Sequence, residues 1–99
     1  MSSYRLLSEA KLELEAAVSF YDSEQVGLGY DFALEAKRLF ERIAESPLTG
    51  QEVRSGLRRR LLRRFPYSVL YTTEAEGILV VAVGHQSRRP GYWVGRAGI

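Results

Sequence analysis

The sequence predicts an α+β domain in which a short N-terminal strand and an antiparallel helical hairpin precede an antiparallel β-sheet, in the order β-α-α-β-β-β. Two features of the chain indicate this class. Apolar residues recur with the helical period of about 3.6 in the first half, and with the strand period of about 2 after Gly50. The chain has 99 residues, which is room for one modest hydrophobic core, so we expect a single domain over residues 1–99.

The N-terminal third predicts a strand followed by a helix. Residues 4–7 have moderate β character, and Ser8 is then expected to cap the helix, with Glu9 in the first turn at the positive end of its dipole. The helix is expected to end where Gly27 and Gly29 turn the chain. Its apolar side chains fall on one helical face: Ala10, Leu14, Ala17, Val18 and Tyr21.

A second helix repeats this spacing and is expected to end before Pro47, which disfavours helix at the residue preceding it. The connection between the two amphipathic helices is short, so they should pack as an antiparallel hairpin. The buried face of the second helix is expected to comprise Phe32, Ala36, Leu39, Phe40 and Ile43.

Three strands are expected after Gly50. The first spans residues 57–65, with Leu57, Leu61 and Phe65 sharing one face, and Pro66 marks its boundary. The second spans residues 67–73, which are rich in β-branched and aromatic side chains. A hairpin loop over residues 74–77 leads to the third strand, residues 78–85, whose continuous apolar run predicts burial on both faces.

The composition excludes several classes of protein. The absence of cysteine rules out disulfides and thiolate chemistry, and a single histidine, His85, rules out a multi-histidine zinc centre, so we expect neither metal nor cofactor. No apolar run approaches the roughly 20 residues that span a bilayer, and the N-terminus does not resemble a signal peptide. We therefore expect a cytoplasmic protein with no membrane partner.

Charge is divided unevenly along the chain. Residues 1–50 hold five basic and nine acidic side chains, a net charge of −4, whereas residues 51–99 hold nine basic and three acidic ones, a net charge of +6. All nine cations of the second half are arginines, whose forked donors suit phosphate and carboxylate groups. This asymmetry predicts a face that meets nucleic acid or an acidic protein segment.

Six arginines lie within residues 54–64, where a strand would direct alternate side chains to opposite faces. Arg58, Arg60 and Arg64 should share one face, and Arg59 and Arg63 the other. An anion-binding face is the functional interpretation of this strand. The structural alternative is a charged edge strand that resists pairing with other chains.

A second basic segment follows the most apolar strand. Arg88 and Arg89 stand near Tyr92, a combination of forked donors, a stacking ring and a phenol that suits contacts with phosphates and bases. Two residues of this segment also have a structural interpretation. Trp93 is expected to close the core, and His85 is either a packed, hydrogen-bonded histidine or a functional one.

The motifs of the second half resemble the RelE/ParE toxin superfamily of type II toxin–antitoxin pairs, in particular the plasmid-stabilisation or ParE-like toxins. The resemblance covers nearly the whole chain in order. The residues that carry it are Pro47 with Gly50, Gly56-Leu57-Arg58, Arg64-Phe65-Pro66-Tyr67, Leu70-Tyr71, and His85, Arg88, Arg89, Pro90, Tyr92 and Trp93.

The resemblance implies a cognate antitoxin and one of two targets: DNA gyrase for a ParE-like toxin, or ribosome-bound mRNA for a RelE-like ribonuclease. Ser68 and Gln86 stand where those ribonucleases carry arginine, which favours gyrase. A degenerate module that binds an antitoxin without toxicity is the third interpretation. A ribonuclease would use Arg59, Arg63, Arg88 and Tyr92, and binding of target or antitoxin is expected at Arg58, Arg60, Arg64, His85 and Arg89.

Overall fold

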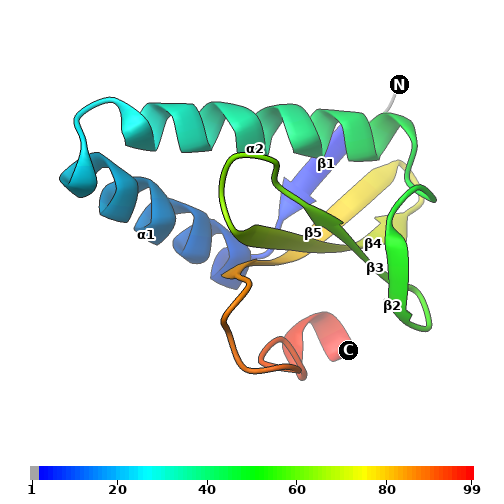
Figure 1. Cartoon of the computed structure of the whole chain (residues 1–99). Helices are drawn as coiled ribbons and strands as arrows, with labels where there is room; N and C mark the ends of the chain where they lie inside the picture. Colours follow the sequence, from blue (N-terminus) through cyan, green and yellow to red (C-terminus); the bar gives the residue numbers. More distant parts are fainter. Residues whose placement is uncertain (1–2) are drawn as a thin grey trace.

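Residues 3–99 are described by the structure, a computed structural model, and they form a helical hairpin beside a five-stranded sheet (Figure 1). The predicted α+β class and element order are confirmed, with one additional strand before the meander. Within this range, no helix has both the length and the apolar character needed to cross a membrane. The elements are β1 (Ser3–Leu6), α1 (Ser8–Glu24), α2 (Leu28–Glu45), β2 (Gln51–Arg54), β3 (Leu57–Leu61), β4 (Tyr67–Glu74), β5 (Gly77–His85) and the short 3-10 helix η1 (Arg96–Gly98).

The sheet has the strand order β1-β5-β4-β3-β2 and is mixed. Strands β3 to β5 form the predicted antiparallel meander, and β2 extends it by pairing antiparallel with β3. Strand β1 pairs with β5 in parallel, with Ser3 opposite Gly77 and Leu6 opposite Val80. A parallel neighbour requires a long connection, which the helical hairpin and the meander supply. The parallel pair ends at Val80, so the rest of β5 has no strand on that side.

The helical hairpin follows the predicted apolar faces, but one cap prediction is wrong. Ser8 is the first helical residue of α1 and not its cap, and its hydroxyl contacts the Glu9 carboxylate at 3.3 Å. The turn between the helices uses Gly27 in the left-handed region, at φ 91°. Gly29 lies against α1 so closely that a Cβ would stand 2.4 Å from the Val18 carbonyl oxygen, which explains glycine at this crossing.

The sheet buries side chains on both faces, as the apolar run of β5 predicts. The face toward the helices packs Val69, Tyr71, Val80 and Val83 against the hairpin. The opposite face has a smaller cluster, and the C-terminal segment, residues 86–99, lies on this side of the sheet (Figure 1). Its side chains Tyr92, Trp93 and Ile99 pack on the cluster. The buried members of the cluster are Leu57, Leu70, Leu79, Val81 and Ala82.

The arginine-rich region differs from the prediction in two respects. Strand β3 ends at Leu61, which is 51% exposed, and Leu57 and Phe65 pack on opposite faces of the sheet. The shared face predicted for these residues is therefore wrong, because the chain leaves the sheet after Leu61 and turns back at Pro66. Strand β2 was missed because all four of its residues are exposed, which leaves no apolar periodicity to detect.

Candidate functional site

The C-terminal segment and strands β2 to β5 line a small pocket of about 230 Å³, here called the sheet-face pocket. Three of the four predicted ribonuclease residues and two of the predicted binding residues line it, together with Ser68 and Gln86. These five predicted residues are Arg59, Arg88, Tyr92, His85 and Arg89.

Tyr92 forms the inner wall of this pocket. Its hydroxyl is buried without a hydrogen-bond partner among residues 3–99 and lies over Gly84, where a Cβ would stand only 1.9 Å from the oxygen. Arg88 and Arg96 lie over the ring, with their guanidinium carbons 4.1 Å and 5.4 Å from its centroid. Burial raises the pKa of Tyr92, the nearby Glu13 carboxylate raises it further, and the two arginines oppose the shift.

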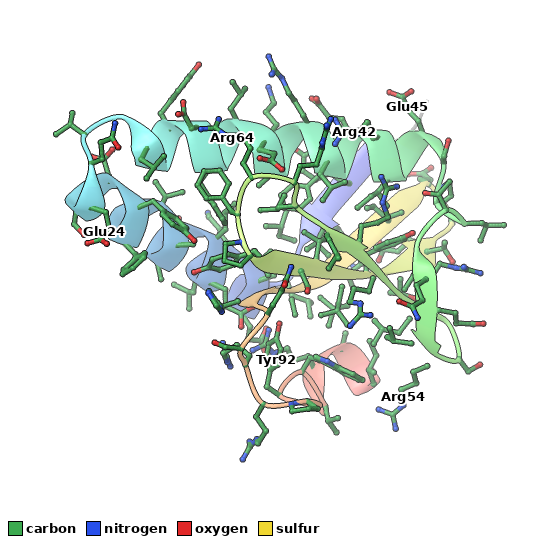
Figure 2. The ribbon with its side chains drawn as sticks, viewed as in Figure 1. Glu24, Arg42, Glu45, Arg54, Arg64 and Tyr92 are labelled. Carbon is green, nitrogen blue, oxygen red and sulfur yellow. The ribbon has the colours of Figure 1, made fainter. Side chains whose placement is uncertain are left out.

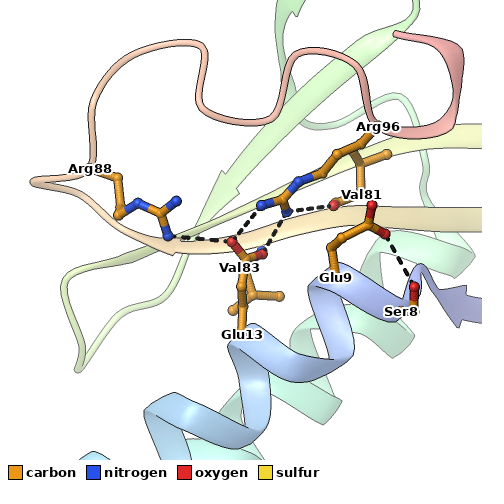
Figure 3. A network of polar contacts seen from close by, with 7 residues as sticks. All are labelled: Ser8, Glu9, Glu13, Val81, Val83, Arg88 and Arg96. Atoms are coloured by element: carbon orange, nitrogen blue, oxygen red, sulfur yellow. Dashed lines mark hydrogen bonds and ion pairs between the residues drawn. The ribbon is translucent and has the colours of Figure 1, made fainter.

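Glu13 of α1 links this pocket to the end of the sheet (Figure 3). Its carboxylate accepts hydrogen bonds from the Val83 amide at 3.0 Å and from both terminal nitrogens of Arg96 at 2.8 and 2.9 Å, and it lies 3.4 Å from Arg88. Arg96 also donates to the Val81 carbonyl at 3.2 Å. These side chains bond the backbone groups of β5 beyond the end of β1, which would otherwise be unpaired.

The Glu13–Arg96 pair is mostly shielded from water, since the two side chains are 14% and 15% exposed. The hydrogen bond and charge of Glu13 raise the pKa of Arg96. The sequence interpretation missed both residues. A signal was available for Glu13, because it falls on the apolar face of α1 between Ala10 and Ala17, where an acid requires a buried partner.

His85 is both packed and positioned at the pocket. Its ring meets Tyr67 edge to face, with centroids 5.3 Å apart, and its Nδ1 accepts a hydrogen bond from the Ser87 amide at 3.0 Å. An accepting Nδ1 leaves the proton of the neutral ring on Nε2. Arg59, from β3, donates to the Gln51 side chain at 2.8 Å and is exposed.

The remaining predicted arginines lie elsewhere. Arg63 lines a second groove with Arg60 and Arg64, so the four predicted ribonuclease residues do not meet in one site. Arg58 donates to the carbonyls of Leu48 and Gly50 at 3.2 and 2.8 Å, which ties the α2–β2 loop to β3.

Trp93 is half-buried and packs on the smaller core cluster, in agreement with the interpretation that it closes the core. Its ring lies 5.6 Å from the guanidinium carbon of Arg54, from β2. The C-terminal segment is thus anchored to the sheet by Trp93 as well as by the Arg96 ion pair.

Comparison with known proteins gives a consistent assignment. Residues 4–90 match the family described as the ParE toxin of the type II toxin–antitoxin system parDE. A solved structure described as the chromosomal ParDE TA system from P. aeruginosa superposes with a TM-score of 0.74 at 16% identity, covering 86% of this chain and 96% of that one. No curated protein sequence matches significantly. The chain belongs to the ParE toxin family, within the RelE/ParE superfamily of type II toxin–antitoxin systems.

Proposed function

We propose that this chain arrests bacterial growth by inhibiting DNA gyrase, and that a cognate antitoxin holds it inactive in the cytoplasm. Membership of the ParE toxin family supports the toxin role. The resemblance to ParE-like toxins implies gyrase as the target. The similar solved structure is described as a ParDE toxin–antitoxin system, which supports an antitoxin as partner.

The burial of Tyr92 is the observation that favours gyrase over mRNA as the target. Cleavage of mRNA requires side chains that activate the 2′-hydroxyl, stabilise the phosphorane and protonate the leaving oxygen, and the resemblance to ribonucleases implies that Tyr92 is one of them. Its hydroxyl is packed against Gly84, without a partner among the described residues and with a raised pKa. A phosphodiester in the pocket would not reach this oxygen unless the C-terminal segment moved.

The charge around the sheet-face pocket also favours gyrase over mRNA as the target. Ser68 and Gln86 line it where RelE-like ribonucleases carry arginine, and Arg88 lies 3.4 Å from the Glu13 carboxylate. The charge available to stabilise a phosphorane is therefore reduced by two missing cations and by one neighbouring anion.

A ribosome-dependent ribonuclease is the second candidate, and the convergence of Arg59, His85, Arg88 and Arg89 on one pocket favours it. Histidine and arginine side chains are suited to proton transfer and phosphate stabilisation. The two candidates make opposite predictions for the same pair of assays.

The test compares the purified wild-type chain with Tyr92→Phe, a variant that removes only the buried hydroxyl. We expect both proteins to inhibit DNA supercoiling by gyrase and neither to cut mRNA at the ribosomal A site. In cells, expression of either protein should arrest growth, and co-expression of the adjacent antitoxin gene should restore it.

Codon-positioned mRNA cleavage by the wild type that Tyr92→Phe loses would refute the gyrase proposal and assign the ribonuclease activity. Normal growth in the presence of folded protein, together with inactivity in both assays, would identify a degenerate antitoxin-binding module.

A further inference from the structure

A second groove, of about 840 Å³, lies between α2 and the β3–β4 connection, and is here called the arginine groove. Figure 2 shows Arg64, from the β3–β4 connection, beside α2, the helix that carries Arg42. Five arginines and two acids line the groove, for a net charge of +3. The arginines are Arg38, Arg42, Arg60, Arg63 and Arg64.

The arginine groove and the sheet-face pocket are separate sites. Arg59 lines the pocket and Arg60 lines the groove, and these consecutive residues of β3 direct their side chains to opposite faces of the sheet. Binding in the arginine groove therefore does not require the residues of the sheet-face pocket.

The two acids of the groove are already engaged within the protein. Glu35 accepts hydrogen bonds from the backbone amides of Arg63 and Arg64, which hold the β3–β4 connection against α2. Asp31 pairs with the Arg64 side chain at 3.4 Å. These contacts hold the β3–β4 connection beside α2. Because both carboxylates are already bonded, they do little to neutralise the other arginines of the groove.

Four guanidinium groups remain without an acidic partner. Over residues 3–99, the side chains of Arg38, Arg42, Arg60 and Arg63 make no ion pair within 4.0 Å, although Arg60 donates to the neutral Thr49 hydroxyl at 2.8 Å. Arg38 and Arg42 are one helical turn apart on α2, about 6 Å along the axis. Like charges at this spacing repel one another, and a bound polyanion would relieve the repulsion.

The lining of the groove favours phosphate over an acidic protein. No aromatic ring lines it, and Leu34 and Leu61 are its only apolar side chains. Among the described residues other than Leu61, the large exposed apolar side chains, which a protein partner would bury, lie outside the groove. They include Phe20 of α1, Val26 of the helix–helix turn and Tyr30 in the first turn of α2. Forked arginines without stacking rings are suited to a phosphate backbone and not to bases.

We propose that the arginine groove binds the phosphate backbone of DNA, independently of sequence and without gyrase. This inference goes beyond the proposed function, because it assigns a direct DNA contact to a site outside the sheet-face pocket. Contacts from four unpaired arginines predict a slope of about −3.6 for log K against log salt concentration. Affinity should therefore fall roughly 150-fold between about 50 and 200 mM salt.

The experiment measures fluorescence anisotropy of a labelled duplex of about 20 base pairs, titrated with the wild-type chain over a series of salt concentrations. Arg38→Gln, Arg42→Gln and Arg63→Gln should each make the slope shallower by about 0.9. Arg42→Lys should keep the slope and weaken binding, because it retains the charge and loses the fork.

Two matched controls remove one positive charge elsewhere. Lys37→Gln alters α2 outside the groove, where Lys37 is 4.0 Å from Glu41, and Arg5→Gln alters β1, where Arg5 is 2.6 Å from Glu74. We expect both controls to bind DNA with the wild-type slope.

Three results would overturn the proposal. The first is no binding at low salt, and the second is an equal loss of slope in the controls and the groove variants, which would indicate attraction by net charge alone. The third is tighter binding of a polyglutamate of similar length than of the duplex, which would assign the groove to an acidic protein. The assay contains no gyrase, so its failure leaves the proposed gyrase inhibition to be judged by its own experiment.

Discussion

Replacing Glu13 by glutamine should lower the free energy of unfolding by more than the same replacement of a solvent-exposed glutamate on a helix would. The carboxylate accepts hydrogen bonds from the Val83 amide and from Arg96, and the Glu13–Arg96 ion pair is mostly buried. Glutamine has nearly the same shape and keeps one acceptor oxygen, but it leaves the charge of Arg96 uncompensated. The variant thus tests the charge pairing and not the packing.

The expected loss in the free energy of unfolding is about 2–3 kcal/mol. Removing one partner of a fully buried ion pair costs roughly 3–5 kcal/mol. That figure is reduced here because both side chains retain some contact with water, at 14% and 15% exposure, and because glutamine still accepts one hydrogen bond. For a chain of this length, the midpoint of thermal unfolding should fall by roughly 10–20 °C.

The assay is urea unfolding followed by far-UV circular dichroism, on the wild type, Glu13→Gln, Arg96→Gln and the double variant. The coupling energy between the two substitutions should be about 1.5–3 kcal/mol, since each removes the same interaction. The exposed Arg5–Glu74 pair, whose atoms are 2.6 Å apart, gives a matched control cycle, because its side chains are 63% and 32% exposed. Its coupling should be much smaller, since water screens an exposed pair.

A loss below about 1 kcal/mol in Glu13→Gln would refute this reasoning, because it would mean that water already compensates Arg96 in the folded state. A coupling equal to that of the Arg5–Glu74 control would do the same. Unchanged stability in Arg96→Gln alone would show that the C-terminal segment is not held by this pair.

Two further substitutions test individual hydroxyl groups. Tyr92→Phe should leave the free energy of unfolding at pH 7 within about 0.5 kcal/mol of the wild type or raise it, because the removed hydroxyl is buried without a partner among the described residues. The raised pKa of Tyr92 means that the folded state keeps this proton to higher pH than the unfolded state does. The free energy of unfolding should therefore decline as the pH rises above about 10, where the tyrosine ionises in the unfolded state first. Urea unfolding at pH 8 and pH 10.5 should show a larger decline for the wild type than for Tyr92→Phe, and equal declines would contradict the raised pKa. Tyr71→Phe should cost about 1–3 kcal/mol of unfolding free energy, because its buried hydroxyl donates to the Pro47 carbonyl at 2.7 Å and accepts from the Gly50 amide at 3.0 Å. A change in urea unfolding below about 0.5 kcal/mol would show that water replaces both bonds.

Local patterns were sufficient for most of the secondary structure. Helix α2 and strand β5 were predicted because each buries a continuous or periodic set of apolar side chains, and burial dominates the energetics of such segments. Strand β2 has four exposed residues and no apolar pattern, and it is ordered through pairing with β3. The end of β3 at Leu61 was missed for a related reason, since that leucine is exposed although its spacing suits a buried face.

The candidate site could be predicted only in part. The sequence showed two segments rich in arginine, residues 54–64 and 88–89, and in the structure Arg59 of the first joins Arg88 of the second and Tyr92 in one pocket. It could not indicate that Arg63 lies in a different groove, because the chain leaves the sheet after Leu61 and the alternation of side chains ends there.

The sequence by itself determined the α+β class, the helical hairpin, the antiparallel meander and the concentration of arginine in the second half, because these depend on composition and local periodicity. Only the tertiary structure decided how distant segments meet. The pairing of Glu13 with Arg96 and the burial of the Tyr92 hydroxyl join α1, β5 and the C-terminal segment. Such contacts depend on the free energy of placing a charge or a hydroxyl among specific neighbours, and one linear sequence does not specify those neighbours until the chain has folded.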